Sequence, residues 1–382
     1  MNILVYFYDV EIQTNSTNSV GRLVADVVGQ LEKTHQVAFF SMNKSYSDEH
    51  ITTKPIPAEI NFFQKLRQKL INAFYTTKKI KAYHLKKEAF RKALLANHEK
   101  YDYILVPALD EVEFLREKFP DACIIYWIHN ISAICKKEYL NFVNKADIFL
   151  SPSRTSYHLL VEKLQPRPLS AEFIFMPNWI ADVFLKKDST ALNNLRAKYH
   201  ITNDEIVFIF SGSDLVLKGK FILEKAIERL GKFSDKKLVF FFAGSQSNVK
   251  LNTTSIRVIS LGIIPPKELA AYYHISHFGC IPSLAYDHCP LALLEMIHCN
   301  VLPIASDIGG IKEITGAGYP YLITEPHEVN KWVDAIQNVI LFPITERNAF
   351  MEKLNESVKA IYNKENSLGI LEEIIKEEHH DK

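Results

Sequence analysis

The sequence has little of what marks a secreted, membrane-spanning or nucleic-acid-binding protein. It has five cysteines in 382 residues and no Cys-x-x-Cys pair, which argues against a disulfide framework or a zinc site and favours a reducing compartment. The first residues lack the basic start and long apolar core of a signal peptide, and no apolar run reaches membrane-spanning length. The formal net charge is only +1, so general attraction to nucleic acid is not implied. These absences predict a cytoplasmic protein.

The composition also excludes disordered and collagen-like classes, because 47% of the residues are hydrophobic and 23% are charged, as in ordinary globular proteins. A chain of this length can form two domains with separate cores. Short apolar runs alternate with amphipathic stretches, once in each half of the chain. The expected strands are 2–8, 36–40, 103–106, 122–126, 146–150, 173–176, 206–210, 238–243, 277–281 and 302–305. The expected helices are 20–33, 110–119, 221–230 and 267–273, with two more beginning at 154 and 290.

The expected strands are continuously apolar rather than alternating, as in parallel sheets that are covered on both faces. Strand–helix alternation that occurs twice predicts an α/β protein with two Rossmann-like, doubly wound domains. Ligands bind at the carboxyl ends of the strands in such sheets, so we expect a site in a cleft that the two domains face. We place the domains at 1–185 and 186–357, with a C-terminal helix at about 358–382 that packs back on the first domain.

One stretch of the second domain, PSLAYDHCPLALLEM (282–296), places two acids around an expected helix start. Pro290 fits the first turn of a helix, where its missing N–H costs nothing, so Asp287 lies in the preceding loop and Glu295 lies inside the helix. The free N–H groups and the positive dipole end of a helix favour an anion. The pattern suits a ligand with hydroxyls and phosphate. Alternatively, Asp287 caps the helix and Glu295 is a solvated or internally paired acid.

A second unusual stretch is the basic segment 62–96, which contains ten Lys or Arg and one acid, Glu88. Its apolar residues recur at helical spacing, which is typical of basic amphipathic helices that lie on anionic membranes. The alternative is a solvated helix face that covers the first sheet. No aromatic stacking platform or recognition motif accompanies the basic residues, so we expect no nucleic-acid partner. The candidate membrane contacts are Lys78, Lys79, Lys86 and Lys87.

The stretch 282–313 resembles the donor-site block of family 4 GT-B glycosyltransferases, the retaining class. In that block a Pro-Ser pair, an acid, seven residues and a glutamate are followed by an apolar strand, Gly-Gly and another glutamate. The matching residues are Pro282-Ser283, Asp287, Glu295, 303–306, Gly309-Gly310 and Glu313. Other segments that resemble the family contain Gly212, Lys218-Gly219, Gly244, Pro177-Asn178 and His129. The resemblance covers most of the chain and is most specific in the second domain.

The resemblance implies how these residues would handle a nucleotide-sugar. Glu295 would accept hydrogen bonds from the ribose hydroxyls, Asp287 would face hydroxyls of the donor sugar, and Lys218 would neutralise the diphosphate as the glycosidic bond breaks. The backbone at the helix start would meet phosphate or sugar oxygens, so no metal or other cofactor is expected. The catalytic candidates are Asp287, Lys218 and His129. The donor-binding candidates are Glu295, Gly212, Ser213, Gly244, Cys289, Pro290, Leu291 and Ala292.

Two departures from the family pattern bear on the donor site. The first carboxylate is Asp287, where glutamate is commoner, and the shorter side chain could alter the sugar that fits. The arginine that often partners the lysine is missing, since Ser213 and Leu217 occupy its expected positions. Lys220 and Arg257 are the alternative second cations.

The first domain offers fewer residues that can be matched to the family. Its first loop lacks the usual two glycines and has Asn18 and Ser19 instead, so these two residues are the candidates on the acceptor side. His129 follows a strand where the family often has a functional histidine, but it is equally consistent with a core histidine. Acceptor contacts therefore cannot be copied across from the family.

The sequence as a whole predicts a retaining, hexosyltransferase-type glycosyltransferase. The enzyme would move a sugar from a nucleotide-sugar donor, a UDP-sugar in preference to a GDP-sugar, to a hydroxyl of a growing, lipid-linked cell-surface glycan such as a polysaccharide or lipopolysaccharide. The basic segment would hold it as a peripheral protein on the inner face of the cell membrane. One alternative is a catalytically degenerate GT-B partner subunit that binds a membrane or another transferase. Another is a nucleotide-sugar epimerase.

Overall fold

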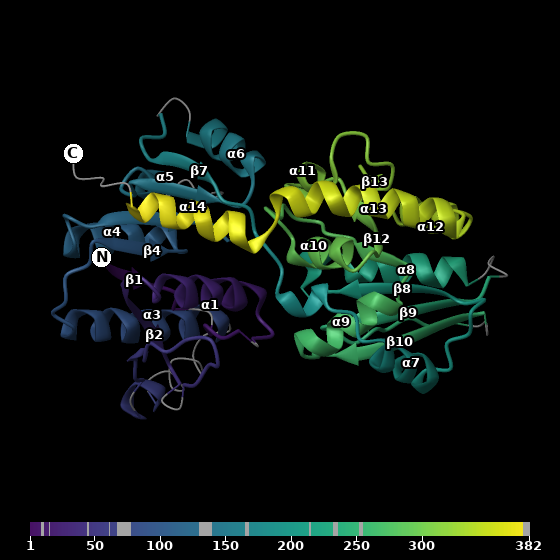
Figure 1. Cartoon of the computed structure of the whole chain (residues 1–382), viewed down its shortest axis with the longest axis horizontal. Coiled ribbons are helices and arrows are strands. Elements are labelled where there is room, and N and C mark those ends of the chain that lie inside the picture. The colour runs from purple at the N-terminus through teal and green to yellow at the C-terminus, as the bar shows by residue number, and fades with distance from the viewer. Residues whose placement is uncertain are drawn as a thin grey trace. The chain divides into compact units, whose positions relative to one another are not determined.

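The computed structural model of the chain contains two compact units (Figure 1). Unit 1 comprises Met1–Ser151, Leu160–Ile174 and the described residues from Leu368 onward. Unit 2 comprises Pro152–Leu159 and Phe175–Ser367. The structure describes residues 1–8, 11–14, 16–43, 46–60, 62–66, 78–129, 140–164, 168–213, 215–231, 236–251 and 255–376.

The described residues of unit 1 form a seven-stranded sheet in the order β3-β2-β1-β4-β5-β6-β7. The strand pairs from β3 to β6 are parallel, and Leu4 of β1 pairs with Ala38 of β2 and with Ile104 of β4. Strand order reverses between β1 and β4, which is where doubly wound sheets bind ligands. The strands are β1 (Asn2–Val5), β2 (Gln36–Ser41), β3 (Ile56–Pro57), β4 (Tyr103–Val106), β5 (Cys123–Trp127), β6 (Ile148–Ser151) and β7 (Glu172–Phe175).

The first helix of unit 1, α1 (Ser19–Leu31), begins at a clear capping residue. Asn18 Oδ1 accepts hydrogen bonds from the backbone N–H groups of Val20 and Gly21 at 2.9 and 3.3 Å. Near the other end of α1, Glu372 of α14 lies 3.5 Å from His35 Nε2, so α14 packs beside this helix. The other helices that contribute to unit 1 are α3 (Lys78–Ala96), α4 (Leu109–Lys118), α5 (Leu140–Val143), α6 (Arg154–Leu164) and α14 (Lys364–Lys376).

The described residues of unit 2 form a six-stranded sheet in the order β10-β9-β8-β11-β12-β13. Every neighbouring pair in this sheet is parallel. Strand order reverses between β8 and β11, where Phe278 of β11 pairs with Phe208 of β8. The strands are β8 (Ile206–Ser211), β9 (Leu238–Ala243), β10 (Ile256–Gly262), β11 (Phe278–Ile281), β12 (Leu302–Ser306) and β13 (Leu322–Ile323). The helices are α7 (Ser189–Lys198), α8 (Lys220–Leu230), α9 (Pro266–Ile275), α10 (Leu291–His298), α11 (Ile311–Thr315), α12 (Val329–Ile340) and α13 (Ile344–Ile361).

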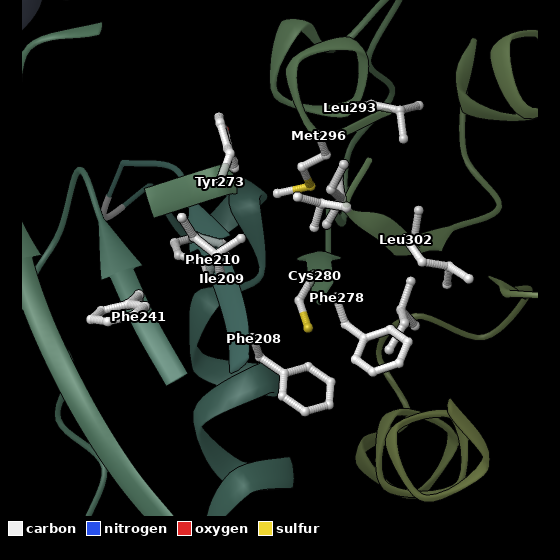
Figure 2. Packing of buried hydrophobic residues seen from close by; sticks show 14 of the residues in the cluster. Phe208, Ile209, Phe210, Phe241, Tyr273, Phe278, Cys280, Leu293, Met296 and Leu302 are labelled. Carbon is white, nitrogen blue, oxygen red and sulfur yellow. The ribbon is translucent and has the colours of Figure 1, made fainter. Parts of the chain in front are cut away.

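The core of unit 2 packs on both faces of its central strands, as Figure 2 shows for β8 and β11. On one face the Phe208 ring lies 5.1 Å from the Phe278 ring, centroid to centroid. On the other face Met296 of α10 lies against β11, where a Cβ at Gly279 would approach the Met296 sulfur to 2.3 Å. Gly279 therefore lets α10 sit close to the strand, and this close approach fixes the position of the helix that bears Glu295.

Both parallel sheets carry helices on connections between successive strands, so the predicted α/β class with two Rossmann-like, doubly wound domains is confirmed. Among the described residues, no helix is long and apolar enough to cross a membrane.

Candidate functional site

The loops that follow β8 and β11 meet at the switch point of the unit 2 sheet. Leu284 donates its N–H to the carbonyl oxygen of Leu217 at 2.8 Å, which joins the two loops directly. Gly219 has a φ of 67°, and a Cβ there would lie 1.7 Å from the carbonyl oxygen of Pro282. Only glycine fits this close crossing, so the Lys218-Gly219 pair is fixed in place by backbone contact with the loop after β11.

Lys218 and Asp287, one from each loop, form an ion pair. Lys218 lies at the end of a short 3-10 turn, Val216–Lys218, and its Nζ is 2.9 Å from Asp287 Oδ2. The two side chains are 42% and 23% exposed, so both remain accessible to a ligand. The structure therefore brings together two of the residues that the sequence predicted as catalytic.

Glu295 lies in the second turn of α10 and is 4% exposed. Tyr273 donates its hydroxyl to Glu295 Oε2 at 3.2 Å, and burial, together with the nearby Glu295 charge, raises the pKa of Tyr273. Glu295 is therefore a buried, hydrogen-bonded acid rather than a solvated one. A buried carboxylate held in this way has a fixed orientation toward any ligand that reaches it.

The start of α10 has no side-chain cap among the described residues, because its N-cap is Pro290 and no acid lies in the first turn. The interpretation that Asp287 caps this helix is wrong, since its carboxylate pairs with Lys218 instead. Helix α10 is eight residues long, and its first backbone N–H groups, on Leu291 and Ala292, lie at the positive end of the helix dipole. This helix start can accept an anion.

The glycine pair after β12 forms the support of the Asp287 loop. Gly310 donates its N–H to the Asp287 carbonyl oxygen at 2.8 Å. A Cβ at Gly309 would lie 2.3 Å from that same oxygen, and one at Gly310 would lie 1.7 Å from the carbonyl oxygen of His288. Asn178, which is 6% exposed, donates its Nδ2 to the carbonyl oxygen of Cys289 at 3.2 Å from another side. The loop is thus held by hydrogen bonds to the backbone carbonyl oxygens of Asp287 and Cys289.

Glu313, which the sequence assigned no role, caps the start of α6. Its carboxylate accepts hydrogen bonds from the N–H groups of Arg154 and Thr155 at 3.0 and 3.1 Å and from the Thr155 hydroxyl at 2.9 Å. The Ser153 hydroxyl also donates to it at 3.0 Å. A carboxylate that accepts hydrogen bonds from the first N–H groups of a helix stabilises it, so Glu313 of α11 stabilises the start of α6.

The two alternative second cations are committed elsewhere. Lys220 Nζ donates to the Gln246 carbonyl oxygen and lies 3.8 Å from Glu224. Arg257 donates to both carboxylate oxygens of Glu205, at 2.7 and 2.9 Å. Lys218 therefore has no help from either residue at the switch point.

The remaining donor-site candidates line the ends of the neighbouring strands. Gly244, with a φ of 83°, donates its N–H to the Gly262 carbonyl oxygen at 2.7 Å, and a Cβ there would lie 2.7 Å from the Gly212 carbonyl oxygen. Ser213 is exposed and Cys289 is buried. The close backbone approach and the positive φ explain the glycine at 244, whereas a Cβ at Gly212 would lie 2.8 Å from the ring of Phe210.

The candidates in unit 1 serve visible structural roles. Asn18 is the cap of α1 and Ser19 is its first residue. The His129 ring lies between aromatic neighbours, with its centroid 5.6 Å from that of Phe7 and 4.4 Å from that of Trp127. His129 thus follows the carboxyl end of β5, and its ring packs against these two aromatic side chains.

The four candidate membrane lysines have different surroundings. Lys87 is 13% exposed and pairs with Asp110 at 2.7 Å and with the fully buried Glu111. Arg91 also donates to both oxygens of Glu111, at 2.7 and 2.8 Å, so Lys87 belongs to an internal ion-pair network. Lys86 is exposed. The side chains of Lys78 and Lys79 lie outside the described residues.

The described residues contain no group of three His, Cys, Asp or Glu side chains that could hold a metal ion. The site is thus made of a lysine, two carboxylates, a helix start and close backbone turns. Two parallel, doubly wound units of this kind are the architecture of the GT-B glycosyltransferases.

Comparison with known proteins agrees with this class, since residues 193–356 match the family described as Glycosyl transferases group 1, and the chain carries a domain of that kind. A D-inositol 3-phosphate glycosyltransferase from Corynebacterium jeikeium (strain K411) is 23% identical over 221 residues, which cover 54% of this chain and 52% of the relative. The chain thus spans about half the length of this curated relative.

Two solved structures share the fold over the whole chain. Sucrose-phosphate synthase from Thermosynechococcus elongatus superposes with a TM-score of 0.77 at 17% identity and covers 100% of both chains. Anabaena Alr3699/HepE in complex with UDP-glucose superposes with a TM-score of 0.71 at 14% identity and covers 98% of this chain and 99% of that one. At these identities the likeness concerns the fold.

Proposed function

We propose that this chain is a retaining glycosyltransferase that moves a sugar from a nucleotide-sugar to a hydroxyl of a growing, lipid-linked glycan, with a UDP-sugar preferred over a GDP-sugar. The observation that carries the proposal is the Lys218–Asp287 ion pair, which lies at the switch point of unit 2 beside the uncapped start of α10. A lysine, a helix start that can bind an anion, and a carboxylate that can accept hydrogen bonds from hydroxyls lie together there. These are the groups that binding of a nucleotide-sugar requires.

Donor binding would exchange the partners of this ion pair. An ion pair between partly exposed side chains contributes only about 0–1 kcal/mol, so opening it costs little. Lys218 would then turn to the diphosphate, whose charge grows as the glycosidic bond breaks, and Asp287 would accept hydrogen bonds from the sugar hydroxyls. The N–H groups at the start of α10 would add further donors for oxygen atoms of the donor. A lysine and a helix start supply this stabilisation without a metal ion.

Glu295 would hold the ribose in this scheme. Its carboxylate is buried and already oriented by Tyr273, so two hydroxyls could be recognised without further ordering. Anabaena Alr3699/HepE, which has the same fold, was solved in complex with UDP-glucose, and this supports testing uridine nucleotides first.

A membrane-borne acceptor is supported by the surface of unit 1. Phe62 and Phe63 are 72% and 77% exposed, and Lys65 and Lys86 are exposed as well. Exposed aromatic rings and exposed basic residues both suit the interface of an anionic bilayer. We place the protein at the inner face of the cell membrane on this basis, with Lys87 excluded from the contact.

Calorimetric titration of the purified chain with UDP, GDP and ADP tests the donor site. We expect UDP to bind most tightly, and Glu295→Gln to weaken UDP binding about tenfold or more because a charged hydrogen-bond acceptor for the ribose is lost. Glu352→Gln, at an exposed position of α13, is the matched control and should bind UDP as the parent chain does.

The other outcomes distinguish the alternatives. If the parent chain bound none of the three nucleotides, this proposal would be wrong, and the alternative that the chain is a catalytically degenerate partner subunit would be favoured. If a UDP-sugar were converted to an epimer without any acceptor, the epimerase reading would replace it. An inverted anomeric configuration in the product would contradict the retaining mechanism.

A further inference from the structure

His288 follows Asp287 directly, and its side chain points into unit 2 instead of toward Lys218. It is 4% exposed, and its Nδ1 is hydrogen-bonded to the hydroxyl of Ser156, a residue in the first turn of α6. Burial lowers the pKa of His288 to about 4, although the neighbouring Asp287 charge acts in the opposite direction. The imidazole is therefore neutral at neutral pH, and a neutral ring can accept the proton of the Ser156 hydroxyl at one nitrogen.

Ser156 is itself held in a defined place. Its N–H donates to the Ser153 hydroxyl oxygen at 3.3 Å, and that hydroxyl donates to Glu313 at 3.0 Å. Ser156 is fully buried, so its hydroxyl has no competing contact with bulk water. The partner of His288 is thus anchored by the same acid that caps α6.

These contacts close a ring of connections around the Asp287 loop. Glu313 lies in α11, which begins directly after Gly310, and Gly310 donates its N–H to the Asp287 carbonyl oxygen at 2.8 Å. From Glu313 the ring runs through the start of α6 to Ser156, and from Ser156 to His288. The loop is therefore held on its main-chain side by Gly310 and on its side-chain side by Ser156.

We propose that His288 is a positioning residue, whose hydrogen bond to Ser156 holds the Asp287 carboxylate where it meets Lys218. This inference rests on the proposed function, in which that carboxylate binds hydroxyls of the donor sugar. Gly310 holds the carbonyl oxygen of Asp287 and Ser156 holds the side chain of the next residue, His288, so the backbone that carries the Asp287 carboxylate is anchored at two adjacent points. The His288–Ser156 hydrogen bond thereby limits how far the Asp287 carboxylate can move when Lys218 leaves it to bind a diphosphate.

The inference predicts a split between the nucleotide and the sugar parts of the donor. Glu295 and the start of α10 do not depend on the His288–Ser156 bond, so UDP should bind Ser156→Ala within about twofold of the parent chain. UDP-glucose, used as the probe, should bind this variant about five- to tenfold more weakly, which is the effect of one poorly placed hydrogen-bond acceptor. A histidine that served only the core would change both affinities together or neither.

Two substitutions of His288 refine the test. His288→Asn can place an amide atom close to the position of Nδ1, so it should recover part of the UDP-glucose affinity. His288→Gln reaches the position of Nε2 and leaves Ser156 without its partner, so it should behave like Ser156→Ala. Equal UDP-glucose affinities in these two variants would overturn the inference.

A ligand-free measurement keeps the inference testable even if UDP-glucose is not bound. Hydrogen exchange of the Gly310 amide reports on its bond to Asp287, so exchange there and across 286–289 should be faster in Ser156→Ala than in the parent chain. Amides of β8 and β9 should exchange at unchanged rates. Unchanged exchange at Gly310 would show that the loop does not depend on Ser156. Failure of UDP-glucose to bind the parent chain would count against the proposed function alone.

Discussion

Gly310 donates its backbone N–H to the carbonyl oxygen of Asp287 at 2.8 Å, and its own Cα faces the next carbonyl along that loop. Gly310 therefore approaches the His288 carbonyl oxygen more closely than any side chain at 310 would allow. Because φ at Gly310 is −79°, its backbone conformation is open to every residue, and the restriction is purely steric.

Gly310→Ala should displace the Asp287 loop. The new Cβ would lie 1.7 Å from the His288 carbonyl oxygen, and relief of this overlap should cost about 1–3 kcal/mol of unfolding free energy. Differential scanning calorimetry would record a lower melting temperature, and nucleotide affinity should fall with it. Gly369→Ala is the matched control, since nothing lies within 4 Å of a Cβ there and the residue is inside α14. A melting temperature for Gly310→Ala equal to that of this control would contradict the steric argument.

Removal of either member of the Lys218–Asp287 pair should affect activity far more than stability. The pair is partly exposed, so Lys218→Met should change the unfolding free energy by no more than about 1 kcal/mol. Loss of the cation at the developing diphosphate charge should lower kcat about 100- to 1,000-fold. Steady-state kinetics and thermal melting on the same preparations check both numbers. Lys331→Met, at a lysine paired with Glu325 on the surface, should leave both unchanged.

Asp287→Asn, combined with Lys218→Met, tests whether the two residues act as a unit. Their separate losses in kcat/KM should not add, because each acts on the same donor and they contact each other. Fully additive losses would indicate two independent roles.

Lys86 and Lys87 are neighbours on α3 and should respond in opposite ways. Lys87→Ala removes one of two cations from the fully buried Glu111 and should cost about 1–3 kcal/mol of unfolding free energy, with little change in membrane binding. Lys86→Ala should leave stability unchanged and weaken co-sedimentation with vesicles that contain anionic phosphatidylserine, by about 1 kcal/mol at low salt. Equal vesicle binding by all three proteins would remove the support for a membrane surface here.

Acid should destabilise unit 2 through His288. The folded chain keeps this imidazole neutral down to a pKa of about 4, whereas the unfolded chain binds a proton near 6.5. The unfolded state therefore binds more protons between these values, and stability is lost as the pH falls through this window. At pH 5 the loss should be about 2 kcal/mol relative to pH 7. Urea unfolding at the two pH values measures it, and His288→Asn, which cannot titrate, should show a shallower pH dependence.

The fold was predictable because its signals are local. The runs 206–210 and 238–243 are apolar at every position, and both became strands that are buried on two faces. Strand β10 escaped prediction because Arg257 and Ser260 interrupt its apolar residues, as expected for a strand at the edge of a sheet that is only partly buried. The short strands β3 and β13 carry two residues each and leave no periodic pattern.

The site was predictable only in part, because much of it depends on contacts between distant residues. The spacing of Asp287 and Glu295 is local and could be read directly. The bonds from Thr155 to Glu313 and from Ser156 to His288 join residues 158 and 132 positions apart, and no pattern in the sequence links the two partners of either bond. Likewise, the basic composition of α3 concealed Lys87, whose partner Glu111 becomes a buried acid only in the folded unit.

In the Lys218–Asp287 pair, each charge of the site is balanced by the other. A small inorganic anion that bound Lys218 would leave the Asp287 carboxylate without its cation and beside a second negative charge, and it carries no sugar hydroxyls to replace that cation. A sugar diphosphate supplies a new partner for each side chain, because its phosphates bind Lys218 while its hydroxyls donate hydrogen bonds to Asp287. We therefore expect the chain to bind inorganic phosphate more weakly than a sugar diphosphate, because only the sugar diphosphate gives both side chains new partners.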